Sequence, residues 1–77
     1  MTRAQLVSSM MASVGYDPLS RVLEIEFATG AVYQYLDVPL DLYQDLLDAP
    51  SQGRFFQSRI RGAFTALAID LSTELWS

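Results

Sequence analysis

Residues 23–38 read LEIEFATGAVYQYLDV, and this stretch decides the predicted fold. Apolar and acidic side chains alternate over residues 23–27, which is typical of a half-buried strand. A second alternating run covers residues 31–38, where Tyr33 and Tyr35 share one face. The sequence Ala28-Thr29-Gly30 between the runs suits a three-residue hairpin loop with its glycine in the left-handed conformation. The stretch therefore predicts an antiparallel hairpin.

The length of the hairpin loop determines which way the two tyrosines face. With a three-residue loop, Ile25 pairs with Tyr33 and Leu23 with Tyr35, and cross-strand partners share a face of the sheet. The tyrosines then join the apolar core, while Glu24, Glu26 and Gln34 face water. A two-residue loop would place the tyrosines over the glutamates instead. We favour the first register because it separates apolar from charged residues more cleanly.

Working outward from the hairpin, the pattern predicts one strand before it and helices after it. Residues 10–16 alternate as a strand, and Asp17-Pro18-Leu19-Ser20 is typical of a type I turn. Pro39 suits the first position of a helix that Pro50 ends. Leu42, Tyr43, Leu46 and Leu47 form the apolar stripe of that helix.

A second helix is predicted to begin at the N-cap Ser51. Phe56, Ile60 and Ala63 share its apolar face. Residues 63–77 fit both a helix and a strand, and we favour the helix. The predicted fold class is therefore α+β: a three-stranded antiparallel β-meander with two or three helices packed on one face. We divide the chain into an N-terminal extension (1–8), a domain (9–64) and an apolar C-terminal tail (65–77).

Composition excludes several classes of function. The chain has 77 residues and contains neither cysteine nor histidine, which removes the thiolate nucleophile, the usual general base and the commonest metal ligands. Asp41, Asp45 and Asp48 fill the polar arc opposite an apolar helical stripe, which is the pattern of a solvated face. We therefore predict no catalytic residue, no metal and no cofactor.

Charge is unevenly distributed along the chain. The formal net charge is −4, and residues 22–53 contain six acidic residues and no basic one. All five basic residues are arginines, and three of them, Arg54, Arg59 and Arg61, lie within residues 54–62. Arginine suits bidentate contact with phosphate or carboxylate. This segment is therefore the candidate anion-binding site.

The start of the second predicted helix strengthens this candidate site. Ser51 and Gly53 precede Arg54 at a helix N-terminus, where unpaired N–H groups and the helix dipole favour an anion. Arg54 and Arg61 are seven residues apart, so on one helix they return to nearly the same face and are predicted to act together. The alternative is that Ser51 only caps the helix and the arginines pair with nearby carboxylates. Tyr33 and Tyr35 are candidates for stacking on bases, although the favoured register makes them core residues.

The C-terminal tail is rich in large apolar residues for so short a chain. Leu71, Leu75 and Trp76 are the candidate interface residues there. An uncovered apolar patch with an aromatic residue is typical of an interface. We therefore predict self-association, or docking of a protein partner, through this tail. No stretch is long and apolar enough to span a membrane, and we expect no membrane partner and a cytoplasmic location.

Two sets of motifs carry a resemblance to a known family. The first set is VGYD at 14–17, LEIEF at 23–27, Gly30 and YQY at 33–35. The second set is VP at 38–39, SQGRFF at 51–56 and IRG at 60–62. Over residues 9–64 this order resembles the KTSC domain family, which occurs at the C-terminus of some lysyl-tRNA synthetases and as small bacterial or phage proteins. The resemblance implies an RNA-binding role.

The sequence supports two functional hypotheses. The first is a non-enzymatic binding module that captures RNA or another phosphate-bearing ligand through its arginines. The second is a protein–protein or self-assembly module, such as a homodimer, that uses the apolar tail. Binding through phosphate contacts weakens steeply with salt and apolar association does not, so salt dependence separates the two.

Overall fold

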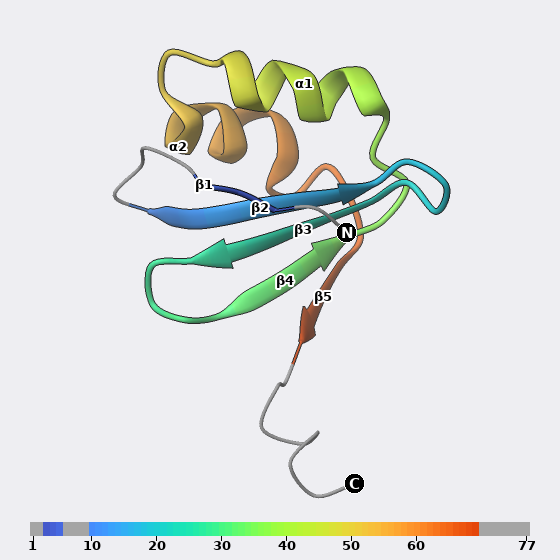
Figure 1. The fold of residues 1–77 in the computed structure, drawn as a ribbon, viewed down its shortest axis with the longest axis horizontal. Helices are drawn as coiled ribbons and strands as arrows, with labels where there is room; N and C mark the ends of the chain where they lie inside the picture. Colours follow the sequence, from blue (N-terminus) through green and yellow to red (C-terminus); the bar gives the residue numbers. More distant parts are fainter. Residues whose placement is uncertain (1–2, 6–9, 70–77) are drawn as a thin grey trace, which may run out of the picture.

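A five-stranded antiparallel sheet with helices on one of its faces makes up the computed structural model, which describes residues 3–5 and 10–69 (Figure 1). The strands follow one another in chain order across the sheet. They are β1 (Arg3–Gln5), β2 (Met11–Asp17), β3 (Val22–Phe27), β4 (Val32–Tyr35) and β5 (Ala66–Ile69). The predicted α+β class and the meander, β2 to β4, are confirmed, and the sheet has one further strand at each edge.

The β3–β4 hairpin has the register that the sequence predicts. Ile25 pairs with Tyr33 and Leu23 with Tyr35. Gly30 closes the loop with a φ of 93°, the left-handed region that favours glycine. Leu23, Ile25 and Tyr35 are buried, and Tyr33 is half-buried. The three-residue loop therefore turns both tyrosines towards the helices.

On the opposite face of the hairpin, polar side chains form hydrogen bonds with neighbouring polar side chains. Glu24, Glu26 and Gln34 are half-buried. The Gln34 side-chain amide donates to the Glu24 carboxylate at 2.9 Å, and the Ser13 hydroxyl donates to the Glu26 carboxylate at 3.0 Å. The expectation that these three residues face water is thus only partly correct.

Strand β2 departs from simple alternation at a bulge. Met11 pairs with Phe27 while Ser13 pairs with Glu26, so the register shifts between Met11 and Ser13. The shift turns Met11 into the core beside Val14 and leaves Ala12 exposed. The predicted alternation, with Ala12 on the same face as Val14, is wrong at this point.

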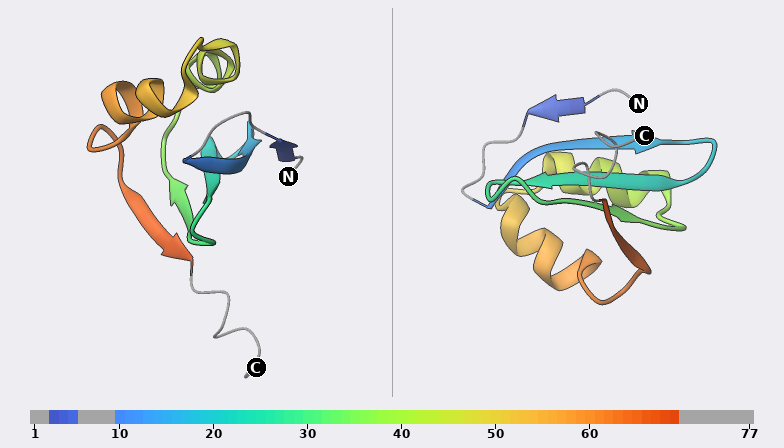
Figure 2. Two further views of the ribbon diagram at one scale, coloured as in Figure 1. Left: turned by 90° about the vertical axis from the view of Figure 1, so that its left-hand side faces the viewer. Right: turned by 90° about the horizontal axis from the view of Figure 1, so that it is seen from below.

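The helical layer consists of α1 (Leu40–Asp48) and α2 (Gln52–Phe55), which continues directly as a π-helical turn, η1 (Phe56–Ile60). Pro39 takes the N-cap position, one residue before the predicted place, and Ala49 is extended before Pro50. Ser51 caps α2 as predicted, because its hydroxyl accepts from the Arg54 N–H at 3.4 Å. Both helical segments lie on the same side of the sheet (Figure 2).

The core lies between this helical layer and the sheet. Leu42 and Leu46 of α1, with Phe56 and Ile60 of η1, are buried against the apolar face of β2, β3 and β4. The Tyr16 ring stacks on Tyr43 with centroids 4.9 Å apart. None of the helices in the described part of the chain is long and apolar enough to cross a membrane.

The prediction of a helix in the tail is wrong for its described part. Arg61 is extended and Gly62 has a φ of 78°, so the helix ends at Ile60. Ala63 lies past this end and is exposed, which corrects its place on the apolar helical face. The chain then pairs β5 with β4, and the Leu36 N–H donates to the Thr65 carbonyl at 2.9 Å. The unpaired edge of β4 provides backbone hydrogen-bond partners for this segment, and the segment therefore forms a strand instead of a helix.

Candidate functional site

An aromatic groove lies between the β3–β4 hairpin and the helical layer. Phe27 at the end of β3 and Tyr33 on β4 meet edge to face, with ring centroids 5.8 Å apart. Phe56 of η1 meets Phe27 at 5.4 Å and Tyr35 at 5.6 Å, again edge to face. These contacts fix the rings in the orientations that aromatic pairs prefer, so the groove is preformed.

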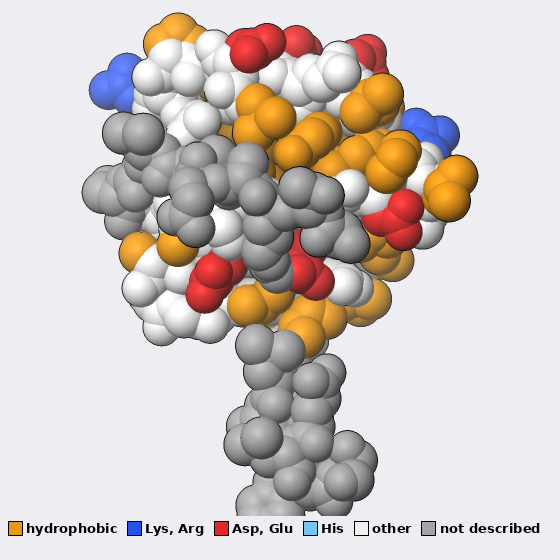
Figure 3. Space-filling view, viewed as in Figure 1, with side chains coloured by type: hydrophobic (Ala, Val, Ile, Leu, Met, Phe, Trp, Pro, Cys, Tyr) orange, Lys and Arg blue, Asp and Glu red, His pale blue; other side chains and the backbone are white. Residues whose placement is uncertain are grey.

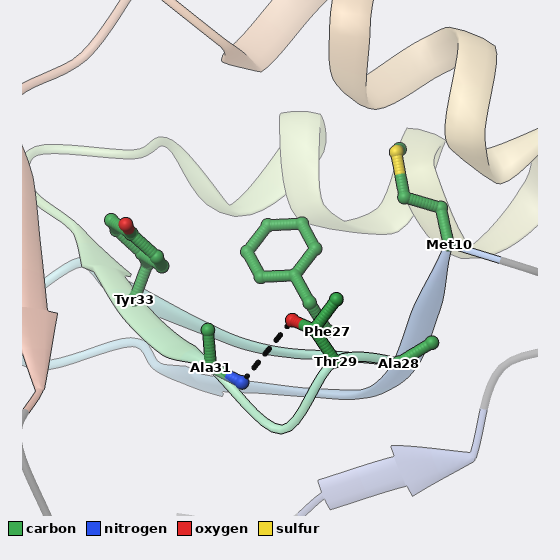
Figure 4. A pocket seen from close by; sticks show the side chains of 6 residues that line it. All are labelled: Met10, Phe27, Ala28, Thr29, Ala31 and Tyr33. Atoms are coloured by element: carbon green, nitrogen blue, oxygen red, sulfur yellow. Dashed lines mark hydrogen bonds between the residues drawn. The ribbon is translucent and has the colours of Figure 1, made fainter.

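The groove has two adjoining lobes that share Met10, Phe27 and Tyr33. The larger lobe, about 540 Å³, extends over the hairpin loop to Thr29 and Ala31 (Figure 4). The smaller lobe, about 290 Å³, extends instead to Tyr35, Phe56 and Arg61. In Figure 4 the Phe27, Tyr33 and Met10 side chains rise from the sheet on its helical side. The groove is therefore apolar along its length and has one cation at the end nearest η1.

Arg61 owes its place at the groove to the end of η1. Its backbone is extended (φ −61°, ψ 123°), which directs the chain away from the helix and towards β5. Arg61 is exposed, and within the described ranges its guanidinium has no carboxylate partner. Burial raises the pKa of the Tyr35 hydroxyl, as does the nearby Tyr33, while the positive charge of Arg61 acts in the opposite direction. Arg61 is thus close enough to the groove to affect its electrostatics.

Arg54 and Arg59 are placed differently from Arg61. Arg54 is exposed on α2 and does not line the groove. Arg59 lies over the Phe55 ring, with its guanidinium carbon 5.4 Å from the ring centroid. The argument that Arg54 and Arg61 share a helix face fails, because Arg61 lies beyond the end of the helix. On the face that Figure 3 shows, arginine side chains lie at two separate places, with acidic side chains along α1 between them.

The remaining predicted residues divide into two groups. The Ser51 hydroxyl accepts a hydrogen bond from the Arg54 N–H, and Gly53 is half-buried in the first turn of α2. Helix capping therefore accounts for the residues at the start of this helix. Leu71, Leu75 and Trp76 lie outside the described residues. Within residues 3–5 and 10–69, no three carboxylates gather as metal ligands would.

Six groove residues were absent from the sequence-based site, and the three with large side chains are Met10, Phe27 and Phe56. The hairpin register contained a signal for Phe27, since it aligns this residue with the tyrosine face. The alternation over residues 10–16 also contained a signal for Met10, because it groups this residue with Val14 and Tyr16 on the core face. Phe56 was expected only as a core residue.

Comparison with known proteins identifies relatives of this arrangement. The family model of the KTSC domain matches residues 7–64. A protein of Stutzerimonas stutzeri is 50% identical over 56 residues, which cover 73% of this chain and 79% of that protein. A lysine–tRNA ligase of Nostoc sp. is 38% identical over 56 residues, which are 73% of this chain and only 10% of the ligase.

A solved structure also resembles the chain. The crystal structure of a KTSC domain protein from Yersinia pestis superposes with a TM-score of 0.87 at 43% sequence identity. The match covers 90% of this chain and 97% of the Yersinia pestis chain. The likeness therefore extends over nearly the whole fold.

Proposed function

The chain belongs to the KTSC domain family, and we propose that it is a non-enzymatic module that binds single-stranded RNA in the aromatic groove beside Arg61. One observation carries the proposal: an exposed guanidinium without a carboxylate partner among the described residues stands at the end of an apolar groove lined by aromatic rings. Such a site offers a stacking surface for a base and a charged fork for the adjoining phosphate.

The chemistry of the groove favours this ligand over a purely anionic one. Phe27, Tyr33 and Met10 present apolar and polarisable surface, which a bare phosphate does not use. Unstacked bases in single-stranded RNA have two open faces, and protein aromatic side chains bind them by stacking. Relatives named lysine–tRNA ligase, whose named substrate is a tRNA, add support. The proposal includes a cytoplasmic location, in keeping with a chain that has no cysteine for disulfides.

The proposal is tested by fluorescence anisotropy with two labelled probes, a short oligouridylate and a short oligoadenylate. We expect Arg61→Ala to weaken binding by at least about tenfold, because a hydrogen bond to a charged group is lost. The dependence of log affinity on log salt concentration should fall by about 0.7, the value for one single-strand phosphate contact. Arg59→Ala is the matched control, since it removes an exposed arginine outside the groove, and should weaken binding only mildly and mainly at low salt.

A second variant examines the stacking part of the site. Tyr33→Leu keeps an apolar side chain but removes the ring, and should weaken binding by about tenfold, since stacking contributes about 1–3 kcal/mol per base. Thermal melting monitors the fold of each variant. Wild-type protein that binds neither probe, or Arg61→Ala protein that binds as well as the wild type, would overturn the proposal.

A further inference from the structure

Strand β5 forms one edge of the sheet, and its sequence contains neither of the residue types that commonly protect an edge. It reads Ala66-Leu67-Ala68-Ile69, with no charged residue and no proline. Ala66, Leu67 and Ala68 are exposed, and Leu67 is 47% accessible. Figures 1 and 2 show the strand at the outer side of β4. A strand of this composition at an edge is a template for pairing with another strand.

One hydrogen bond fixes which backbone groups of β5 point outward. The Leu36 N–H donates to the Thr65 carbonyl, so Thr65 points its backbone groups at β4. In an antiparallel ladder this direction alternates along the strand. Leu67 and Ile69 therefore also point towards β4, and Ala66 and Ala68 point to the open edge. The residues with outward donors and acceptors are those with the smallest side chains, so nothing bulky hinders a partner strand.

We propose that β5 pairs antiparallel with β5 of a second copy of this chain, about a two-fold axis through Leu67. Ala66 of each copy then exchanges backbone hydrogen bonds with Ala68 of the other. Leu67 faces its own twin as a non-hydrogen-bonded pair, with Cα atoms about 4.5 Å apart. In this register, residues 65–69 of one copy lie opposite residues 69–65 of the other. The exposed Leu67 side chain of each copy is then covered by the Leu67 side chain of its partner.

A second copy fits this edge better than a charged partner does. Antiparallel pairing of the strand with itself places only alanine, leucine, isoleucine and threonine opposite one another, so no like charges meet within the paired segment. The axis is perpendicular to the sheet, because the pairing continues the ladder in its own plane. Both helical layers, and both aromatic grooves, therefore lie on the same side of one continuous sheet. The inference concerns assembly and is independent of RNA binding.

Disulfide trapping tests the register directly, since the chain contains no cysteine of its own. Leu67→Cys should cross-link to its twin under mild oxidation, because Cα atoms about 4.5 Å apart are within disulfide range. Leu19→Cys, at a side chain 95% exposed in the turn after β2, is the matched control and should stay monomeric on a non-reducing gel. Equal cross-linking of the two variants would overturn the proposed register.

Sedimentation velocity of the full chain over a range of concentrations tests the pairing itself. We expect the wild type to form a dimer. Two substitutions should convert this dimer to a monomer without changing the melting temperature of the monomer. Ala68→Pro removes an outward N–H without touching the β4 ladder, and Leu67→Lys places two positive charges at the axis. Leu19→Lys should dimerise like the wild type. A wild-type monomer at every concentration, or a dimer that survives both edge substitutions, would overturn the proposal.

Discussion

Gly30 is the residue on which the β3–β4 hairpin most depends. Its φ of 93° lies where a β-branched side chain is strained, although no atom crowds the position. We expect Gly30→Val to lower the free energy of unfolding by more than about 1 kcal/mol. Ala28→Val, in the same loop but without a positive φ, is the control. Urea melts of the two variants that coincide with the wild type would show that the backbone here is not constrained.

Asp17 links the turn after β2 to acid stability. Hydrogen bonds from the Ser20 hydroxyl and the Leu19 N–H lower the pKa of its carboxyl below the ordinary value of 3.8. A lowered pKa means that the contribution to stability is full above about pH 3.8 and is lost as the pH falls through the folded-state value. Asp17→Asn should therefore reduce the loss of stability on acidification. Identical acid unfolding curves for variant and wild type would contradict this.

The turn itself shows how closely a local pattern specifies backbone geometry. Asp17-Pro18-Leu19-Ser20 predicts a four-residue turn, and the turn is present. It closes one residue later, where the Arg21 N–H donates to the Asp17 carbonyl at 2.7 Å and Arg21 takes a φ of 59°. Composition indicates that a turn forms, while the strands it must connect determine its length.

At the scale of elements, a helix or strand could be predicted from the sequence where interactions between residues close in the chain determine it. The register of β3 and β4 could be derived because a glycine loop and an alternation of apolar and acidic residues agree. Helix α1 could be derived because two prolines bound an apolar stripe. For β5 the helical and strand periods compete over four residues, and the free edge of β4 decides between them. The same non-local effect adds β1 to the other edge.

The contact between β2 and α1 provides a test of how elements are joined. The Tyr16 hydroxyl donates to the Val38 carbonyl just before α1, and both residues are buried. Tyr16→Phe keeps the stack on Tyr43 but leaves a buried carbonyl unsatisfied, which should cost about 1–3 kcal/mol of unfolding free energy. Tyr43→Phe, which keeps both the stack and this hydrogen bond, is the control and should lose less. Equal losses in chemical denaturation would contradict the assignment.

At the scale of the whole molecule, the candidate site was only partly derivable from the sequence. The distribution of charge along the sequence identified the arginine segment, residues 54–62, and the family motifs include the same residues. The groove required tertiary structure, because Met10, Phe27 and Phe56 converge from three elements separated along the chain. Arg61 reaches it only because a π-helical turn and Gly62 redirect the backbone.

The overall charge adds a constraint on how an anion reaches this groove. A net charge of −4 repels RNA at long range, so local arginines must offset the repulsion. Under the proposed function, Arg54, which lies outside the groove, would act on RNA only through this field, whereas Arg61 would make the contact. Because the two residues then share no partner, their effects on binding free energy should add within about 0.3–0.5 kcal/mol.

A double-mutant cycle with the labelled oligouridylate measures this additivity. Arg54→Ala should weaken binding mildly, and mainly at low salt, because a charge without direct contact is screened by ions. Arg61→Ala should weaken it more, and the double variant should weaken binding by close to the product of the two single effects. Its melting temperature should stay close to that of the wild type, since both side chains are exposed and neither has a carboxylate partner among the described residues. A coupling energy well above the additive limit would mean that both arginines hold one phosphate. Unfolding of the double variant would mean that they are structural, and anion capture by these residues would be excluded.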